Sequence, residues 1–164
     1  MNQNPNEAPQ PDRILEGRGA WRQALRERLL DPGPTLCMYS DDYADWPLAE
    51  PALVEALTAW ALPRRQPCVR MLARDYSRVQ QECPRFVRWR VDFGHLIECR
   101  ELAPGLPAPA EGLWLREQGV LALPAQNQRR AVFTRDASWQ ASLQEFEQAW
   151  NLAEPGFAAT ALGL

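Results

Sequence analysis

Apolar side chains recur along the chain with two spacings, one typical of helices and one typical of buried strands. Trp21, Leu25 and Leu29 stand four residues apart, which predicts an amphipathic helix over residues 19–30. Continuous apolar runs follow this helix and predict strands that are buried on both faces of a sheet. The whole pattern predicts further helices over residues 50–62 and 75–92 and from Asp136 onward, and strands over residues 35–39, 68–73, 95–101, 112–117, 120–123 and 130–134.

Prolines and a glycine set several of the predicted boundaries. Pro51 is expected in the first turn of its helix, where the missing N–H costs nothing. Pro84 should divide the 75–92 helix into two pieces, because the residue before a proline avoids the helical region. Gln118 and Gly119 are expected to form the turn of a hairpin between the strands on either side of them.

The predicted elements follow one another in the order α-β-α-β-α-β-β-β-β-α, which indicates the α/β class. Strands that alternate with helices need crossover connections, so we expect a mixed, mainly parallel sheet with helices on both faces. The later hairpin adds antiparallel strands to this sheet. Residues 19–164 are predicted to form a single domain, and the polar, proline-bearing residues 1–18 are predicted to form a disordered tail.

Composition narrows the class of protein but not its activity. The 164 residues are 46% apolar and 24% charged, which is ordinary for a globular domain. The net charge is −3, so nucleic acid is not expected as a partner, and no apolar run is long enough for a membrane span. Because the chain starts without a signal sequence, we expect it to be cytoplasmic.

Charge is distributed unevenly along the chain. Residues 31–62 carry six acidic residues and no arginine, whereas residues 64–100 carry nine arginines and four acidic residues. We expect these two segments to be neighbours whose charges complement each other. The alternative is that the second segment forms a basic face for phosphate groups.

Cysteines and histidine form no recognisable catalytic or metal-binding motif. None of Cys37, Cys68, Cys83 and Cys99 belongs to a C-x-x-C pair, and they are predicted to be reduced thiols inside the fold. His95 is the one histidine, and a lone histidine at the start of a strand is more typical of packing than of catalysis. We therefore expect no cofactor and no metal.

Three stretches of the chain carry a resemblance to a known family. They read DDYADWPLAEPALVEALTAWA over residues 41–61, LARDYSRVQQECPRFVRWR followed by HLIECR within residues 72–100, and FEQAW with FAATALGL near the end. With them, the chain from Trp21 to Leu164 resembles a family of small uncharacterised proteobacterial proteins, a domain of unknown function that supplies no catalytic residues. The order of elements and the closing helix also resemble one half of the phospholipase D fold.

The phospholipase D resemblance implies a chemistry that this chain has lost. Members of that superfamily carry an H-x-K-x4-D motif on the first arm of the late hairpin, where the histidine attacks phosphorus and the lysine holds phosphate oxygens. Glu111, Leu113 and Gln118 stand at the three motif positions in this chain, so no motif residue is retained. The resemblance therefore implies a non-catalytic domain, a protein-interaction or regulatory module rather than an enzyme. It also implies a homodimer, since half domains of this kind are expected to pair.

An aspartate cluster supports an alternative function. Asp41, Asp42 and Asp45 follow the first predicted strand and Asp75 follows the second, so the carboxyl ends of two parallel strands could bring them together. Such a cluster could hold Mg²⁺ for a metal-dependent phosphodiesterase or hydrolase. The competing interpretation is structural, because aspartates also favour turns and helix starts, where they accept backbone N–H bonds.

The run RFVRWR over residues 85–90 is the remaining candidate site. Arg85, Arg88 and Arg90, with the aromatic side chains between them, would form a basic face able to hold single-stranded nucleic acid. On a helix, however, the aromatic side chains would point inward and the arginines outward. In that case the run is a solvated helix face that pairs with the acidic segment 31–62.

Overall fold

Apolar residues at almost every position of the central strands bury the sheet on both faces. In β2 (Leu36–Ser40) all five residues are buried, and in β3 (Val69–Ala73) only Arg70 is partly exposed. The computed structural model describes residues 13–123, 130–134 and 137–158. Because side chains alternate between the faces of a strand, each face of this sheet needs its own covering layer.

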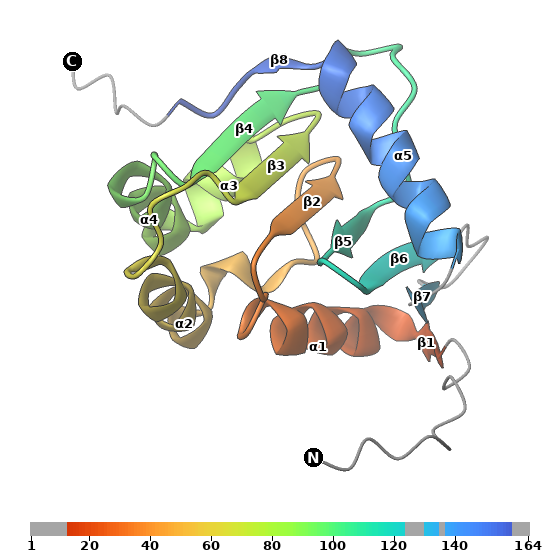
Figure 1. Ribbon diagram of the computed structural model, residues 1–164, viewed down its shortest axis with the longest axis horizontal. Helices are drawn as coiled ribbons and strands as arrows, with labels where there is room; N and C mark the ends of the chain where they lie inside the picture. Colours follow the sequence, from red (N-terminus) through yellow and green to blue (C-terminus); the bar gives the residue numbers. More distant parts are fainter. Residues whose placement is uncertain (1–12, 124–129, 135–136, 159–164) are drawn as a thin grey trace.

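The helices and strands follow the predicted order, with an additional short strand at each end (Figure 1). Pro51 lies in the first turn of its helix, and Pro84 starts the second of the two helices expected over residues 75–92, as predicted. Asp136 lies outside the described residues. Besides β2 and β3, the elements are β1 (Arg13–Glu16), α1 (Gly17–Leu29), the 3-10 helix η1 (Pro47–Ala49), α2 (Pro51–Ala61), α3 (Ser77–Glu82), α4 (Pro84–Asp92), β4 (Ile97–Glu101), β5 (Gly112–Trp114), β6 (Gly119–Leu123), β7 (Arg130–Thr134), α5 (Ala137–Leu152) and β8 (Glu154–Pro155).

The strands form one mixed sheet in the order β1-β7-β6-β5-β2-β3-β4-β8. Its mixed character and its α/β class confirm the prediction. The expected predominance of parallel pairing is wrong, because in the described residues only β2–β3 and β3–β4 are parallel and the other five pairings are antiparallel. The reason is that the described residues between β4 and α5 contain no crossover helix, so β5 runs back beside β2 and β6 follows it through a short hairpin turn, which joins antiparallel strands.

The two faces of the sheet are covered by different helices, as expected. Leu36, Met38 and Met71 point to the face on which α1, α2, α3 and α4 pack. Tyr39 and Leu72, one residue further along their strands, point to the opposite face and pack with α5. Figure 1 shows α5 lying across this second face by itself. None of the described helices is long and apolar enough to cross a membrane.

The outer strands correct the prediction for the ends of the chain. Arg13–Glu16 lies within the range expected to be a tail, but it forms β1 and pairs antiparallel with β7. Half-buried Leu15 also packs against the core, so this segment contributes to the domain. At the other edge, β8 pairs with β4. Neither short strand has the apolar run that predicted the central strands.

Two buried tyrosines tie the parallel strands together. The Tyr43 hydroxyl donates to a carbonyl oxygen of β2 at 3.1 Å and to one of β3 at 2.8 Å. The Tyr76 hydroxyl donates to carbonyl oxygens of β3 and β4, both at 2.9 Å. Burial raises the pKa of Tyr43 and of Tyr76 well above the ordinary value, so both hydroxyls remain donors. Tyr43 also has a backbone φ of 61°, a left-handed conformation that a bulky residue adopts only where its contacts fix it.

We expect the free energy of unfolding to fall as the pH rises above about 10, the ordinary pKa of tyrosine. Above that pH the unfolded chain loses its tyrosine protons, whereas Tyr43 and Tyr76 keep theirs in the folded state, so alkaline pH favours unfolding. The double variant Tyr43→Phe/Tyr76→Phe should be less stable at neutral pH and less sensitive to alkaline pH. Urea unfolding followed by circular dichroism measures both effects. Equal pH slopes for the two proteins would contradict the assignment.

Candidate functional site

The carboxyl end of β2 meets the start of β5, and this junction places a carboxylate among buried side chains. Tyr39 is paired with Gly112, so Glu111 lies beside Ser40. Ser40 Oγ donates to Glu111 Oε1 at 2.8 Å, and Trp46 Nε1 donates to the same oxygen at 2.9 Å. Ser40 and Trp46 are each only 2% exposed. The half-buried Glu111 carboxylate therefore joins β5 to the segment that follows β2.

A cavity of about 320 Å³ opens at this junction. Its lining includes Tyr39, Ser40, Asp41, Asp42, Asp45 and Glu111. The carboxyl ends of the strands are the edge at which α/β sheets bind ligands. The cavity is thus at the expected place, and three of the four candidate aspartates line it.

Arginines from the loop after β3 and from α3 engage the first two aspartates. Asp41 accepts a hydrogen bond from the Tyr39 hydroxyl and lies 3.6 Å from Arg74 Nε. Burial and this hydrogen bond raise the pKa of Tyr39, which keeps its hydroxyl a donor. The Asp42 carboxylate lies 3.3 Å from Arg78 Nε and also accepts a hydrogen bond from the backbone N–H of Ala44. These pairs confirm that the acidic and the arginine-rich segments are neighbours.

The other two aspartates also have partners of their own. Asp45 lies 3.9 Å from Arg18 Nε on α1. Asp75 accepts hydrogen bonds from the backbone N–H and the hydroxyl of Ser77 at the start of α3, at 2.9 and 2.6 Å. These bonds lower the pKa of Asp75. The Asp75 backbone N–H donates to the Asp41 carbonyl at 3.0 Å, so the two loops touch, but the Asp75 side chain turns to its own helix.

The aspartates are not arranged as a metal site in the described residues. No group of three or more histidine, cysteine, aspartate or glutamate side chains there is placed to hold a metal ion. The roles predicted by the structural interpretation are present instead: Asp42 accepts a hydrogen bond within its turn, and Asp75 accepts one at a helix start. The chemical effect of this arrangement is that arginines neutralise the aspartates of a neighbouring loop.

The prediction of a basic face on α4 is wrong for one of the three arginines. Arg85 and Arg88 are exposed, and Arg88 pairs at 3.2 Å within its own helix rather than with the acidic segment. Arg90 is only 6% exposed and donates to the carbonyl oxygens of Ile97 and Phe157 at 3.0 and 3.2 Å. The helical period explains the difference, because position 90 lies four residues after buried position 86 and so on the inward side.

His95 lies far from the Glu111 carboxylate. It precedes β4 and contacts the ring of Phe93, with 6.3 Å between ring centroids. The whole of β4 separates it from the carboxyl edge of the sheet, and at about 3.3 Å per residue a five-residue strand is roughly 16 Å long. The one histidine of the chain therefore cannot replace the histidine that the motif lacks.

Sequence reasoning named Glu111 only as a replacement at a motif position and did not identify its partners. Ser40 and Trp46 stand 71 and 65 residues earlier in the chain, and no local pattern links them to it. One signal was available. Trp46 packs edge-on against Tyr43, with 4.9 Å between the ring centroids, and a buried tryptophan has a polar N–H that needs an acceptor.

Solved structures of low sequence identity share this fold. TrmBL2, described as an archaeal chromatin protein with a novel mode of DNA binding, has a TM-score of 0.67 at 15% identity, over 93% of this chain and 57% of that chain. Nuc from Salmonella typhimurium, a phospholipase D family member, has a TM-score of 0.57 at 12% identity, over 88% of this chain and 98% of that chain. NucT from Helicobacter pylori has a TM-score of 0.55 at 6% identity, over 88% of this chain and 98% of that chain.

These likenesses show the fold alone, and they confirm the predicted resemblance to the phospholipase D fold. The chain spans 57% of the TrmBL2 chain and 98% of the Nuc and NucT chains. Proteins of the same fold can carry unrelated activities. The activity of any one of these neighbours therefore does not transfer to this chain.

Comparison of sequences places the chain in a family. No curated protein sequence matches it. The model of a domain of unknown function, DUF7931, matches residues 21–162. This range begins at Trp21, where the predicted family resemblance also begins, and it includes every residue of the Glu111 junction. The chain belongs to the family of the domain of unknown function DUF7931.

Proposed function

We propose that this domain acts by binding another molecule and not by cleaving phosphodiesters. The observation that carries the proposal is the position of Glu111. It stands where the phospholipase D motif has its histidine, and its carboxylate already accepts hydrogen bonds from Ser40 and Trp46. A residue that holds two elements together in this way is a structural group. It supplies no imidazole to attack phosphorus.

The other two motif positions support the same proposal. Leu113, at the lysine position, is fully buried in the core and offers no cation to phosphate oxygens. Gln118, at the aspartate position, lies before β6, in the turn that follows β5, where its backbone carbonyl accepts from the Leu115 N–H at 2.8 Å. An amide in that place cannot act as a carboxylate would toward a histidine.

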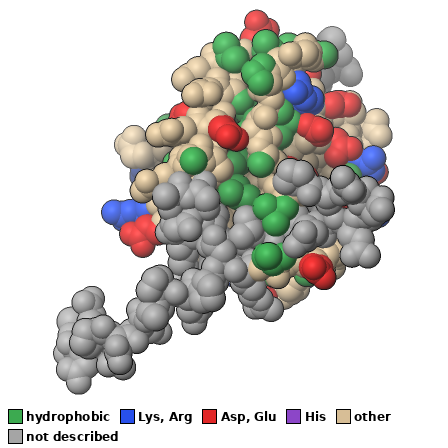
Figure 2. Space-filling model, turned by 90° about the vertical axis from the view of Figure 1, so that its right-hand side faces the viewer, with side chains coloured by type: hydrophobic (Ala, Val, Ile, Leu, Met, Phe, Trp, Pro, Cys, Tyr) green, Lys and Arg blue, Asp and Glu red, His purple; other side chains and the backbone are tan. Residues whose placement is uncertain are grey.

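A protein partner, with a second copy of the chain as the simplest case, is part of the proposal. Figure 2 shows the side of the molecule on which α5 lies, and hydrophobic side chains gather there in a band beside acidic ones. Leu152, at the end of α5, is 52% exposed. Nucleic acid is a less suitable partner, since several arginines of the 64–100 segment are already engaged by carboxylates or carbonyl groups, Arg74 and Arg90 among them.

Replacing Glu111 should destabilise the fold. Glu111→Ala removes the acceptor of the Trp46 N–H and should lower the free energy of unfolding by about 1–3 kcal/mol, the usual cost of a buried polar group without a partner. Glu111→Gln keeps an acceptor oxygen and should lose less. Urea unfolding at neutral pH measures both variants. Wild-type stability in Glu111→Ala would mean that the residue has no structural role.

The wild-type protein should not hydrolyse bis(p-nitrophenyl) phosphate above the rate of the buffer, with or without Mg²⁺ or Mn²⁺. Calorimetric titration with either ion should give no heat of binding. The metal-dependent hydrolase that uses Asp41, Asp42, Asp45 and Asp75 makes the opposite prediction. Hydrolysis and metal binding that disappear in Asp42→Ala and Asp75→Ala, but persist in the exposed control Glu55→Ala, would replace the proposed function by that hydrolase.

The full chain should form a dimer in solution, with a mass about twice the 18.7 kDa of one chain. Gel filtration coupled to light scattering measures this mass. If the hydrophobic band beside α5 is the interface, Leu152→Asp should yield monomers, because it places a charge in the contact. Leu62→Asp, at a residue that is 61% exposed after α2, is the matched control and should remain a dimer. A monomeric wild type would contradict the pairing.

A further inference from the structure

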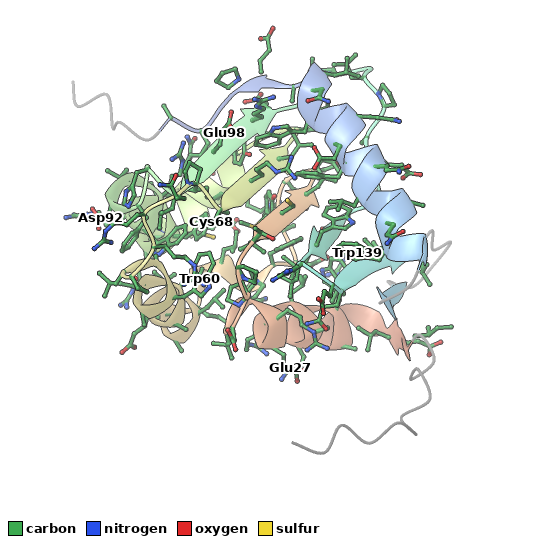
Figure 3. The ribbon with its side chains drawn as sticks, in the orientation of Figure 1. Glu27, Trp60, Cys68, Asp92, Glu98 and Trp139 are labelled. Carbon is green, nitrogen blue, oxygen red and sulfur yellow. The ribbon has the colours of Figure 1, made fainter. Side chains whose placement is uncertain are left out.

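A second cavity lies on the α5 face of the sheet, away from the Glu111 junction. Its volume is about 350 Å³, within the range of about 300–1,000 Å³ that is typical of small-molecule sites. Among the residues that line it are Cys37, Arg70, Trp114, Arg116, Trp139 and Leu143. Figure 3 shows Trp139 at the start of α5 and Cys68, another lining residue, at the start of β3.

The course of α5 leaves this space open. From its start beside β6 to its end beside β8, α5 crosses the sheet (Figure 1). It covers Tyr39 and Leu72 in the carboxyl halves of β2 and β3. The amino-terminal ends of the same strands, with Cys37 and Arg70, lie beside the helix and form one wall of the cavity. The space is thus a consequence of one helix covering a wide sheet.

The cavity combines apolar walls with the guanidinium of Arg116. Trp114 is 1% exposed, and half-buried Trp139 and Leu143 form the helix side. Arg70 is held by two hydrogen bonds to Glu147 on α5, one of them 2.7 Å long. Within the part of the chain that the structure describes, the exposed guanidinium of Arg116 makes no hydrogen bond or ion pair.

The remaining lining groups do not cancel this charge. The Glu98 carboxylate is engaged by Arg100, which donates to it at 2.9 and 3.0 Å. Burial raises the pKa of the Cys37 thiol and of the Cys68 thiol, so both are neutral groups at physiological pH. The cavity therefore offers an apolar body, neutral sulfur atoms and one available positive charge.

One of the lining residues, Trp139, has an indole N–H without an acceptor in the described part of the chain. The Nε1 atom of this indole is buried. Leaving such a donor unpaired costs about 1–3 kcal/mol. By contrast, the Trp114 indole donates to Ser142 Oγ at 2.9 Å and is fixed. A rotation of the half-buried Trp139 ring toward an acceptor in the cavity would recover the missing hydrogen bond.

We propose that this cavity binds a small aromatic carboxylate, with its ring against Trp139 and Leu143 and its carboxylate at Arg116. The carboxylate matches the available cation, and one of its oxygens can accept the Trp139 N–H. Arginine and tryptophan together select a planar anion with an apolar body. This site is independent of the proposed loss of hydrolysis, since it shares no lining residue with the cavity at Glu111.

The test uses the full chain and a matched pair of probes, indole-3-acetate and its uncharged amide, in isothermal titration calorimetry. The acid should bind more tightly than the amide. Arg116→Gln should weaken the acid about tenfold, which corresponds to roughly 1.4 kcal/mol, and leave the amide unchanged. Arg85→Gln, at an exposed arginine on α4, is the control and should change neither.

Two further measurements locate the probe. Leu143→Trp fills the cavity and should abolish binding of both probes, with circular dichroism to check that the variant folds. In the wild type, the NMR signal of the Trp139 indole N–H should move on addition of the acid, which needs no variant. The proposal is wrong if the acid does not bind the wild type, if acid and amide bind equally, or if the Trp139 signal stays in place.

Discussion

A carboxylate that lies among buried side chains must have hydrogen-bond donors, and the Glu111 junction meets this requirement with groups from distant parts of the chain. Ser40 supplies its donor from the end of β2, and Trp46 supplies the other from the loop that follows. The Ser40 hydroxyl also accepts the Tyr43 N–H at 2.9 Å. The same contacts therefore fix β5 beside β2 and hold the left-handed backbone of Tyr43, from which the tyrosine reaches the strand carbonyls.

The aspartate side chains around this junction are held by partners of their own. Asp41 and Asp42 face Arg74 and Arg78 of the neighbouring loop and helix, and Asp75 is used at the start of α3. Pairs that are exposed in this way contribute little stability each, about 0–1 kcal/mol. Their effect is to neutralise the edge where a sheet of this kind usually binds a ligand. A cavity remains at that edge, but the charges of the aspartates beside it are paired with the protein's own arginines.

The elements that depend on a local sequence pattern could be predicted. The elements and side chains whose position depends on a partner far away in the chain could not. The central strands were predictable because burial on both faces leaves an unbroken apolar run. The break at Pro84 was predictable because a proline inside a helix removes a backbone hydrogen bond and restricts the residue before it. Strand β1 was missed because its place depends on β7, more than a hundred residues away in the chain. Arg90 was assigned to the surface although the helical period places it on the inward side. The reason is that a guanidinium is buried only where it has acceptors, and the local pattern does not show the carbonyl oxygens of Ile97 and Phe157 that accept from it.

The candidate site shows the same division between local and distant causes. The place of the aspartates at the carboxyl ends of the strands was predictable from the order of elements, whereas their partners were not. A fold shared at 12% identity or less shows the arrangement of the sheet and does not show the chemistry. Where ion pairs of the protein balance the charge at the carboxyl edge of such a sheet, a charged ligand must bind at another cavity, one that has a charged group available to meet it. Beside α5, a single helix leaves part of a wide sheet uncovered, and the cavity there is lined by Arg116, whose guanidinium has no partner among the described residues.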